Sequence, residues 1–425
     1  MFRRIGSRMA ALVKAYTRLG RFSGAVLVAR GDRVLLSQGY GMASYEHGVP
    51  NTPTTAFRIG SQTKAFTAMA ILRLQEEGVL SVDTPLSAFL AGYLNGGRIT
   101  LHHLLTNTSG IPDYITTDDF TRTMGLPRTT EELIATFKDR PLLFTPGERV
   151  SYSNSGWVLL GAVIERVSGR PYGEHIRERL LEPLGMERSG LGRYGDVLPG
   201  HADGYMSQDG EMIRTPYLDN SNQHAAGALH STAEDMFRWS RGLRSCAVLS
   251  RAATDLLLGE PAYGFAVGRG TGGRARVESS GGTIGYVSVT ASYPDDDLTI
   301  VVLSNVENAA YAEIESGLAA IAFGEPYEMP TARVFVPADP EVFDSYVGLY
   351  TCSFMGRTSQ MRVTAEGERL MVEVQGLAKT ELRPMSRTRY FARMKGEVEL
   401  TFVGEPAREI SMVWSGHAVT ARRVS

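Results

Sequence analysis

Apolar residues follow a strand-like spacing near the start of the chain, a helical spacing from about 83 to 225, and a strand-like spacing again from residue 263 onward. The first 22 residues are an exception. They are basic and predict an amphipathic helix whose apolar face carries Met9, Leu12, Val13 and Tyr16. Two strand-like runs, 24–30 and 33–41, then flank Gly31-Asp32, a dipeptide typical of a hairpin turn.

The strand-like segments after the helical stretch are expected to join those before it in one sheet. Four strand-like segments (263–270, 274–282, 286–294 and 298–305) lead into a predicted helix at 309–324. The three aspartates at 295–297 fit a solvated turn between two of these strands. The pattern predicts an α+β fold: one antiparallel sheet, built from both ends of this region, flanked by helices and carrying a helical insertion.

Residues 328–340 contain three prolines and predict a linker. Beyond them, short alternating segments with closely spaced turn signals predict a small antiparallel β-barrel or sandwich at 341–425. The expected organisation is therefore a first domain at 1–327, with its helical subdomain at about 83–225, followed by the linker and the small β domain.

The composition of the chain bears on its binding partners, its location and its cysteines. The 425 residues carry a net charge of −2, which does not favour nucleic acid or an anionic membrane as a partner. The sequence contains neither a run of about 18 apolar residues nor a secretory signal pattern, so we expect no membrane span and a cytoplasmic location. Cys246 and Cys352 fit two free thiols, with a single disulfide as the alternative.

Lysine is rare in this chain, with five lysines against 39 arginines, so its position at Lys64 is informative. Lys64 follows Ser61 by three residues on a predicted apolar helix, which places both side chains on one face. A buried lysine can lose its proton near neutral pH and activate a serine, whereas an arginine stays protonated. The alternative is an ordinary surface lysine on an amphipathic helix.

Two further segments could complete such a site. Tyr152 and Asn154 lie in a loop before a predicted helix, where a tyrosine can relay protons and an asparagine can hydrogen-bond a lysine or a substrate. Gly281 and Gly282 lie in a strand-like segment where backbone N–H groups could hold an oxyanion together with that of Ser61. Taken separately, these segments also fit a buried tyrosine and a glycine-rich turn. Adjacent His102 and His103 have poor geometry for a metal, so we expect no metal and no cofactor.

With these three segments in this order, the chain resembles the serine β-lactamase and penicillin-binding-protein superfamily, in particular its class C-like branch of D-aminopeptidases, esterases and acyltransferases. The resemblance covers about residues 10–325 and includes "FRIGSQTKAFTAMAILRL", "LLTNTSGIPDY" and "AAGALHSTAEDM". It implies Ser61 as nucleophile, Lys64 and Tyr152 as proton-transfer groups, and Asn154 as a substrate-orienting residue. The last 85 residues resemble the lipocalin-like barrel that some members carry.

The chain departs from the family in its third motif, which is usually Lys or His, a small residue, then Gly. Here Ser279, Ser280 and Gly281 occupy it, with Gly282 next. In the family the missing cation helps to hold a substrate carboxylate, so its loss argues against β-lactamase and carboxypeptidase activity. His224 and His230 are candidates to replace it, although a core or surface role fits both.

The leading hypothesis is a serine hydrolase that acts on a small-molecule or peptide ester or amide through an acyl-enzyme. The first alternative is an acyltransferase or peptide cyclase that passes the acyl group to an amine or alcohol. The second is a non-catalytic binding protein on the same fold.

Overall fold

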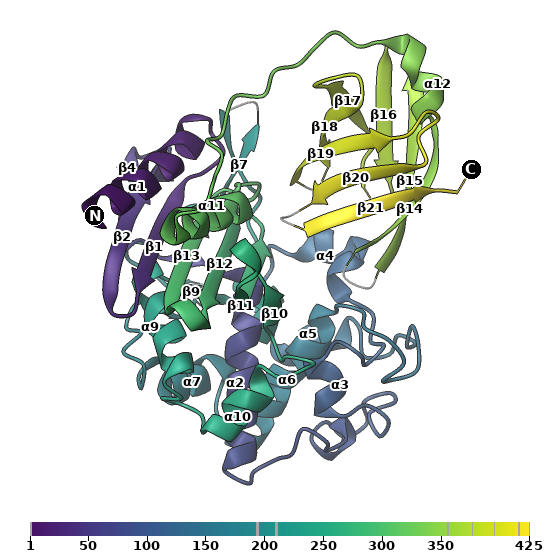
Figure 1. Ribbon diagram of the computed structural model, residues 1–425. Helices are drawn as coiled ribbons and strands as arrows, with labels where there is room; N and C mark the ends of the chain where they lie inside the picture. Colours follow the sequence, from purple (N-terminus) through teal and green to yellow (C-terminus); the bar gives the residue numbers. More distant parts are fainter. Residues whose placement is uncertain are drawn as a thin grey trace. The chain divides into compact units, whose positions relative to one another are not determined.

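The computed structural model describes residues 2–192, 195–208, 211–354, 357–375, 377–394, 396–414 and 417–424 (Figure 1). The chain divides into two compact units, Met1–Pro330 and Thr331–Ser425. The boundary between them falls inside the segment predicted as a linker.

A six-stranded antiparallel sheet forms the centre of the first unit. Its strands lie in the order β10 (Ala266–Arg269), β11 (Ala275–Thr283), β12 (Tyr286–Tyr293), β13 (Leu298–Ser304), β1 (Gly24–Arg30) and β2 (Arg33–Tyr40). The β1–β2 hairpin turns at Gly31-Asp32, as predicted, and β13 pairs with β1 from the other end of the unit. The predicted α+β class, with a sheet assembled from both ends of this region, is confirmed.

The sheet separates two hydrophobic cores. Along β13, Ile300 and Val302 face one core, while Val301 and Leu303 face the other, as the two-residue period of a strand requires. The first core is closed by α1 (Phe2–Arg18) and α11 (Tyr311–Phe323), which pack on each other (Figure 1). The predicted apolar face of α1 is buried there, and Met9 and Val13 are fully enclosed.

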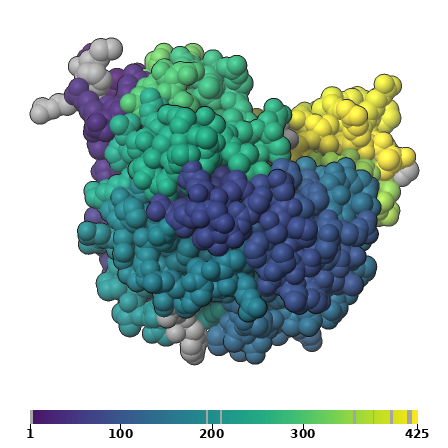
Figure 2. Space-filling view, turned by 90° about the horizontal axis from the view of Figure 1, so that it is seen from below, coloured from purple at the N-terminus to yellow at the C-terminus, as the bar shows by residue number. Residues whose placement is uncertain are grey.

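The second core is covered by α2 (Thr63–Glu76), α9 (Ala233–Arg244) and the helical insertion. The other helices on this side are α3 (Leu101–Leu105), α4 (Asp118–Thr123), α5 (Thr130–Ala135), α6 (Asn154–Ser168), α7 (Tyr172–Ile176), α8 (His224–Gly227) and α10 (Arg251–Leu257). In Figure 2 the insertion, coloured blue to teal, forms a continuous surface of the first unit.

The insertion is not purely helical, because it also contains a two-stranded hairpin of β7 (Tyr205–Gln208) and β8 (Glu211–Arg214). A small three-stranded sheet, β5 (Phe57–Arg58), β9 (Leu229–Ser231) and β6 (Gly190–Leu191), joins the insertion to the segment that leads into α2. These strands are too short for their periodicity to be read from the sequence.

The second unit is a closed antiparallel barrel, which confirms the barrel alternative. Its eight strands are β14 (Gly348–Phe354), β15 (Arg357–Glu366), β16 (Arg369–Val374), β17 (Thr380–Pro384), β18 (Arg389–Met394), β19 (Gly396–Val403), β20 (Glu409–Trp414) and β21 (His417–Arg423). The short helix α12 (Phe343–Tyr346) contributes to its core, where the ring of Tyr346 stacks on Phe402 at 4.2 Å.

Part of the predicted linker packs on the outside of this barrel. The backbone N–H of Val336 donates to the carbonyl of Pro384 at 3.0 Å, and the ring of Phe335 lies 5.9 Å from that of Phe391. Both cysteines are free thiols. Within the described ranges, no helix has the length and apolar character needed to cross a bilayer.

Candidate active site

Ser61 lies in a short 3-10 turn, η1 (Gly60–Gln62), that connects β5 to α2. Gly60 has a φ of +53°, and a Cβ there would lie 2.9 Å from the backbone of Gly282. From the other side, a Cβ on Gly281 would lie 2.0 Å from the carbonyl oxygen of Ile59 and 2.8 Å from the Ser61 nitrogen. Strand β11 therefore presses directly on the turn, and glycine is needed on both sides of the contact.

The side chains of Ser61, Lys64 and Tyr152 meet. Lys64 Nζ lies 2.9 Å from Ser61 Oγ, to which its ammonium form donates, and Ser61 Oγ is 2.7 Å from Tyr152 Oη. Nζ also lies 4.9 Å from the centre of the Tyr152 ring. The structure thus brings together the three residues that the sequence predicted as catalytic.

Lys64 has two further partners, and both only accept hydrogen bonds. Nζ donates to Asn154 Oδ1 at 2.9 Å and to the carbonyl oxygen of Ala226 at 2.6 Å. The Ala226 carbonyl belongs to α8, which is also held against α2 by a 2.8 Å hydrogen bond from Thr67 Oγ1 to the carbonyl of Ala225. A backbone carbonyl from the insertion is therefore part of the lysine's environment.

Burial lowers the pKa of Lys64 from 10.5 to about 7, and the nearby charge of Asp113 partly opposes this effect. The side chain is 3% exposed. Because burial disfavours the ammonium form, a large share of Lys64 is neutral at pH 7 and has a lone pair available to accept a proton.

Asp113 orients Asn154, the first residue of α6. Asn154 Nδ2 lies 3.3 and 3.2 Å from the two carboxylate oxygens of Asp113, and the Asn154 backbone N–H donates to Oδ1 of the same group at 3.2 Å. Asp113 is 4% exposed, so this contact is removed from solvent. The sequence analysis identified Asn154 but not Asp113.

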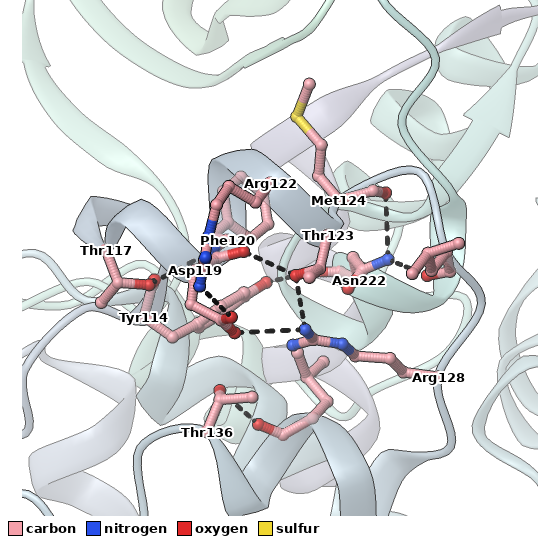
Figure 3. A network of polar contacts seen from close by, with 12 residues as sticks. Tyr114, Thr117, Asp119, Phe120, Arg122, Thr123, Met124, Arg128, Thr136 and Asn222 are labelled. Atoms are coloured by element: carbon pink, nitrogen blue, oxygen red, sulfur yellow. Dashed lines mark hydrogen bonds and ion pairs between the residues drawn. The ribbon is translucent and has the colours of Figure 1, made fainter.

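A polar network holds the loop that carries Asp113 (Figure 3). The hydroxyl of Tyr114 donates to the carbonyl of Asn222, and Asn222 Nδ2 donates to the carbonyls of Met124 and Leu126 at 3.1 and 2.7 Å. Asn222 lies two residues before His224, the first residue of α8. The network therefore links two segments that flank Lys64, one carrying Asp113 and the other the Ala226 carbonyl.

The side chain of Ser279 points into the protein. It is 3% exposed, and its Oγ donates to Gln62 Oε1 at 3.0 Å. Gln62 Nε2 donates to Ser288 Oγ at 2.7 Å, and Ser288 in turn donates to the carbonyl of Ile59 at 2.9 Å. A chain of neutral groups therefore occupies the position where the family usually has a cation.

The remaining third-motif residues follow the alternation of β11. Gly281 is buried against η1, whereas Ser280 is half-buried and Gly282 is exposed. Among the described residues, a Cβ on Gly282 would have only Val287 Cγ1 within 4 Å, at 3.9 Å, so the described atoms leave space beside its backbone. Gly285, with a φ of +84°, belongs to the turn between β11 and β12.

The two candidate histidines have other contacts. His224 Nε2 lies 3.3 Å from both Glu165 Oε1 and Thr130 Oγ1. His230 packs edge-on against His201, and burial lowers its pKa to about 4, with Arg58 adding to the effect. These contacts fit the structural role considered for both residues.

Several known proteins are similar to this chain. A family model described as beta-lactamase matches residues 9–322. The chain is 31% identical over 436 residues to penicillin-binding protein 4* of Bacillus subtilis, covering 95% of each chain. Among solved structures, a penicillin-binding protein from Bacillus halodurans is 28% identical with a TM-score of 0.63, covering 74% of this chain and 97% of that one.

A penicillin-binding protein homologue from Pyrococcus abyssi, described as octameric, is similar over both units. It covers 98% of this chain and 99% of its own length, with a TM-score of 0.68. At 24% identity this similarity concerns the fold alone.

Proposed function

Because this chain belongs to the beta-lactamase family, we propose that it is a serine hydrolase that cleaves esters or amides through an acyl-enzyme on Ser61. The observation that carries the proposal is the contact of Ser61 Oγ with both Lys64 Nζ and Tyr152 Oη. A serine hydroxyl becomes nucleophilic when a base removes its proton, and two candidate proton carriers lie within hydrogen-bond distance.

The proposed reaction starts with proton transfer from Ser61 to the neutral amine of Lys64. Ser61 Oγ then forms a bond to the substrate carbonyl carbon, and the carbonyl oxygen gains the negative charge. Backbone N–H groups of Ser61 and Gly282 hold that oxygen. As the carbon–leaving-group bond breaks, Lys64 and Tyr152 return a proton to the departing alcohol or amine. Water then attacks the acyl carbon and gives a proton to Lys64. The bond from that carbon to Ser61 Oγ breaks, Ser61 regains a proton, and the acid is released.

The substrate we propose has no free carboxylate next to the scissile bond. A carboxylate that enters a partly buried site loses hydration and needs a cationic partner. Ser279 and its hydrogen-bond partner Gln62 are neutral and bonded to each other. Small esters and amides without a free carboxylate, including amides of D-amino acids, therefore fit better than peptides ending in a carboxylate.

The test is covalent labelling and turnover in the whole chain. We expect a fluorophosphonate to label the wild type and to leave Ser61→Ala unlabelled, and a p-nitrophenyl ester to be hydrolysed only by the wild type. Absence of Ser61-dependent labelling and turnover would contradict the proposal. Product analysis with an added amine or alcohol separates hydrolysis from acyl transfer, since both begin with the same acyl-enzyme.

A further inference from the structure

The amide group of Asn154 can face Lys64 in only one favourable orientation. Its Nδ2 contacts both carboxylate oxygens of Asp113, and an ionised carboxylate only accepts hydrogen bonds. The amide nitrogen must therefore face Asp113, and the amide oxygen must face Lys64. In the reverse orientation the amide oxygen would face the carboxylate and the NH2 group would face the amine.

The orientation of the Asn154 amide determines which groups accept hydrogen bonds from Lys64 Nζ. A neutral amine has two N–H donors and one lone pair. Asn154 Oδ1 and the Ala226 carbonyl each require a donor, so both N–H groups are directed to them. The third partner of Nζ is Ser61 Oγ, and the lone pair is left for its hydroxyl proton. A flipped Asn154 would instead offer an N–H to the lone pair.

We propose that Asp113 is a positioning residue for the Ser61 acyl-enzyme chemistry: it holds the Asn154 amide so that the lone pair of Lys64 is directed at Ser61. This inference rests on the proposed function for the identity of the nucleophile. Asp113 touches neither Ser61 nor the reacting carbonyl in this mechanism, and it acts through Asn154.

Asp113 is itself held firmly enough for this role. Its carboxylate accepts from the Asn154 backbone N–H at 3.2 Å in addition to the side-chain contacts. The next residue, Tyr114, is buried and hydrogen-bonded to Asn222. The same loop is tied to α6 by a 3.1 Å hydrogen bond from the Tyr114 backbone N–H to Ser155 Oγ.

The titratable groups around Lys64 come from several elements. Asp113 lies in the loop before η3 (Tyr114–Thr116), which contributes Tyr114, and Tyr152 comes from the loop before α6. From α7, Tyr172 is hydrogen-bonded to Thr67 at 2.7 Å. On α8, His224 is directed to Glu165. Among these groups, Asp113 is the one whose negative charge stabilises the ammonium form of Lys64.

The decisive experiment measures the titration of Lys64 directly. With five lysines in the chain, ¹³C labelling of lysine side chains gives few NMR signals, and Lys64→Met identifies the one from Lys64. We expect Asp113→Asn to lower the titration midpoint of Lys64, because an opposite charge that favours the ammonium form is removed. Asp118→Asn, at an exposed position five residues away on α4, is the control and leaves the midpoint unchanged.

Kinetics then test the orientation. We expect Asp113→Asn to lower kcat/KM for a p-nitrophenyl ester by roughly 10- to 100-fold, as a small displacement of a catalytic group does. If Asp113 acts through Asn154, the same substitution has little further effect in an Asn154→Ala background. An unchanged Lys64 midpoint in Asp113→Asn, or full additivity with Asn154→Ala, would overturn the proposal.

If Asp113→Asn does not fold, Asp113→Glu keeps the charge and is expected to leave the Lys64 midpoint near that of the wild type. A midpoint shifted downward in Asp113→Glu would also count against the proposal. The NMR titration needs no turnover, so a failure of the proposed hydrolase activity and a failure of the Asp113 inference give different results.

Discussion

Ser279 Oγ donates a 3.0 Å hydrogen bond to Gln62 Oε1. The first side chain of the third motif is therefore bonded to the residue that directly follows Ser61, the candidate nucleophile. The two groups are neutral and buried. Their pairing gives a prediction about substrate charge.

A matched pair of acyl donors tests this prediction. We expect an N-acyl-D-alanyl-D-alanine peptide with a C-terminal carboxamide to react at least roughly tenfold faster than the same peptide with a free carboxylate. The carboxylate loses hydration without gaining a cationic partner, and about 1.4 kcal/mol corresponds to that factor. The measurement is kcat/KM for both peptides, and a preference for the free acid would contradict the prediction.

Glycines in the neighbouring strands β10 and β11 have different expected tolerances to substitution. Gly281→Ala places a Cβ 2.0 Å from the carbonyl oxygen of Ile59, so either the strand or the Ser61 turn must move. We expect loss of at least roughly 100-fold in kcat/KM together with lower stability in urea unfolding. Gly268→Ala, in the neighbouring strand β10, is the matched control, because no described atom lies within 4 Å of an added Cβ there. Equal effects of the two substitutions would argue against the close contact between β11 and η1.

The buried Lys64 links stability to pH. Its pKa of about 7 in the folded protein lies below the usual 10.5, so between these values the unfolded state binds more protons. The free energy of unfolding is therefore not reduced by Lys64 above pH 10.5, and it is reduced progressively as the pH falls from 10.5 toward 7. Relative to Lys64→Met, we expect the wild type to gain about 2 kcal/mol in unfolding free energy between pH 7 and pH 9.

Urea unfolding of both proteins at the two pH values measures this difference. Lys14→Met, at an exposed position of α1, serves as the control and should show no such pH-dependent difference from the wild type. If Lys64→Met behaves like Lys14→Met, the folded-state pKa of Lys64 is not depressed.

Lys64 also predicts the acidic limb of the activity profile. The neutral amine is the form that accepts the Ser61 proton, so kcat/KM should rise with pH through about pH 7 and level off above it. A pH–rate profile with a neutral ester measures this rise. A value of kcat/KM that does not change between pH 5.5 and pH 8 would exclude Lys64 as the base.

The hydroxyl of Tyr152 is expected to matter for chemistry more than for folding. Tyr152→Phe removes the 2.7 Å contact with Ser61 Oγ, and we expect kcat to fall by about 100-fold or more. Tyr172→Phe also removes a 2.7 Å hydroxyl contact, to Thr67, in the same core. That control should cost about 1 kcal/mol of stability and change kcat only a few-fold. Similar decreases of kcat in both variants would indicate that the Tyr152 hydroxyl has a structural role and not a chemical one.

The parts of the site that the sequence predicted are those with a local pattern. Ser61 and Lys64 are one helical turn apart, so their proximity follows from helix geometry alone. The meeting of this pair with Tyr152 required the resemblance to a known family, because it joins residues 91 positions apart.

The residues that the sequence analysis missed have no local signature. Asp113 contacts Asn154 across 41 residues and comes from an irregular loop. Ala226 contributes a backbone carbonyl, so its side-chain type carries no information about its contact with Lys64. Gln62 is buried beside the nucleophile and is recognised only when Ser279 is seen to donate to it. Tertiary contacts of this kind are fixed by packing and not by periodicity.

The stacking of Tyr346 on Phe402 has a consequence for the C-terminal unit. The rings of Tyr346, Tyr350, Tyr390 and Phe402 are all at most 2% exposed and belong to one packed core. Small barrels of eight strands either hold a ligand in their lumen or fill it with side chains, and among the described residues these four rings occupy part of the interior. These rings serve as packing for the unit itself, and their contacts hold its strands together from within.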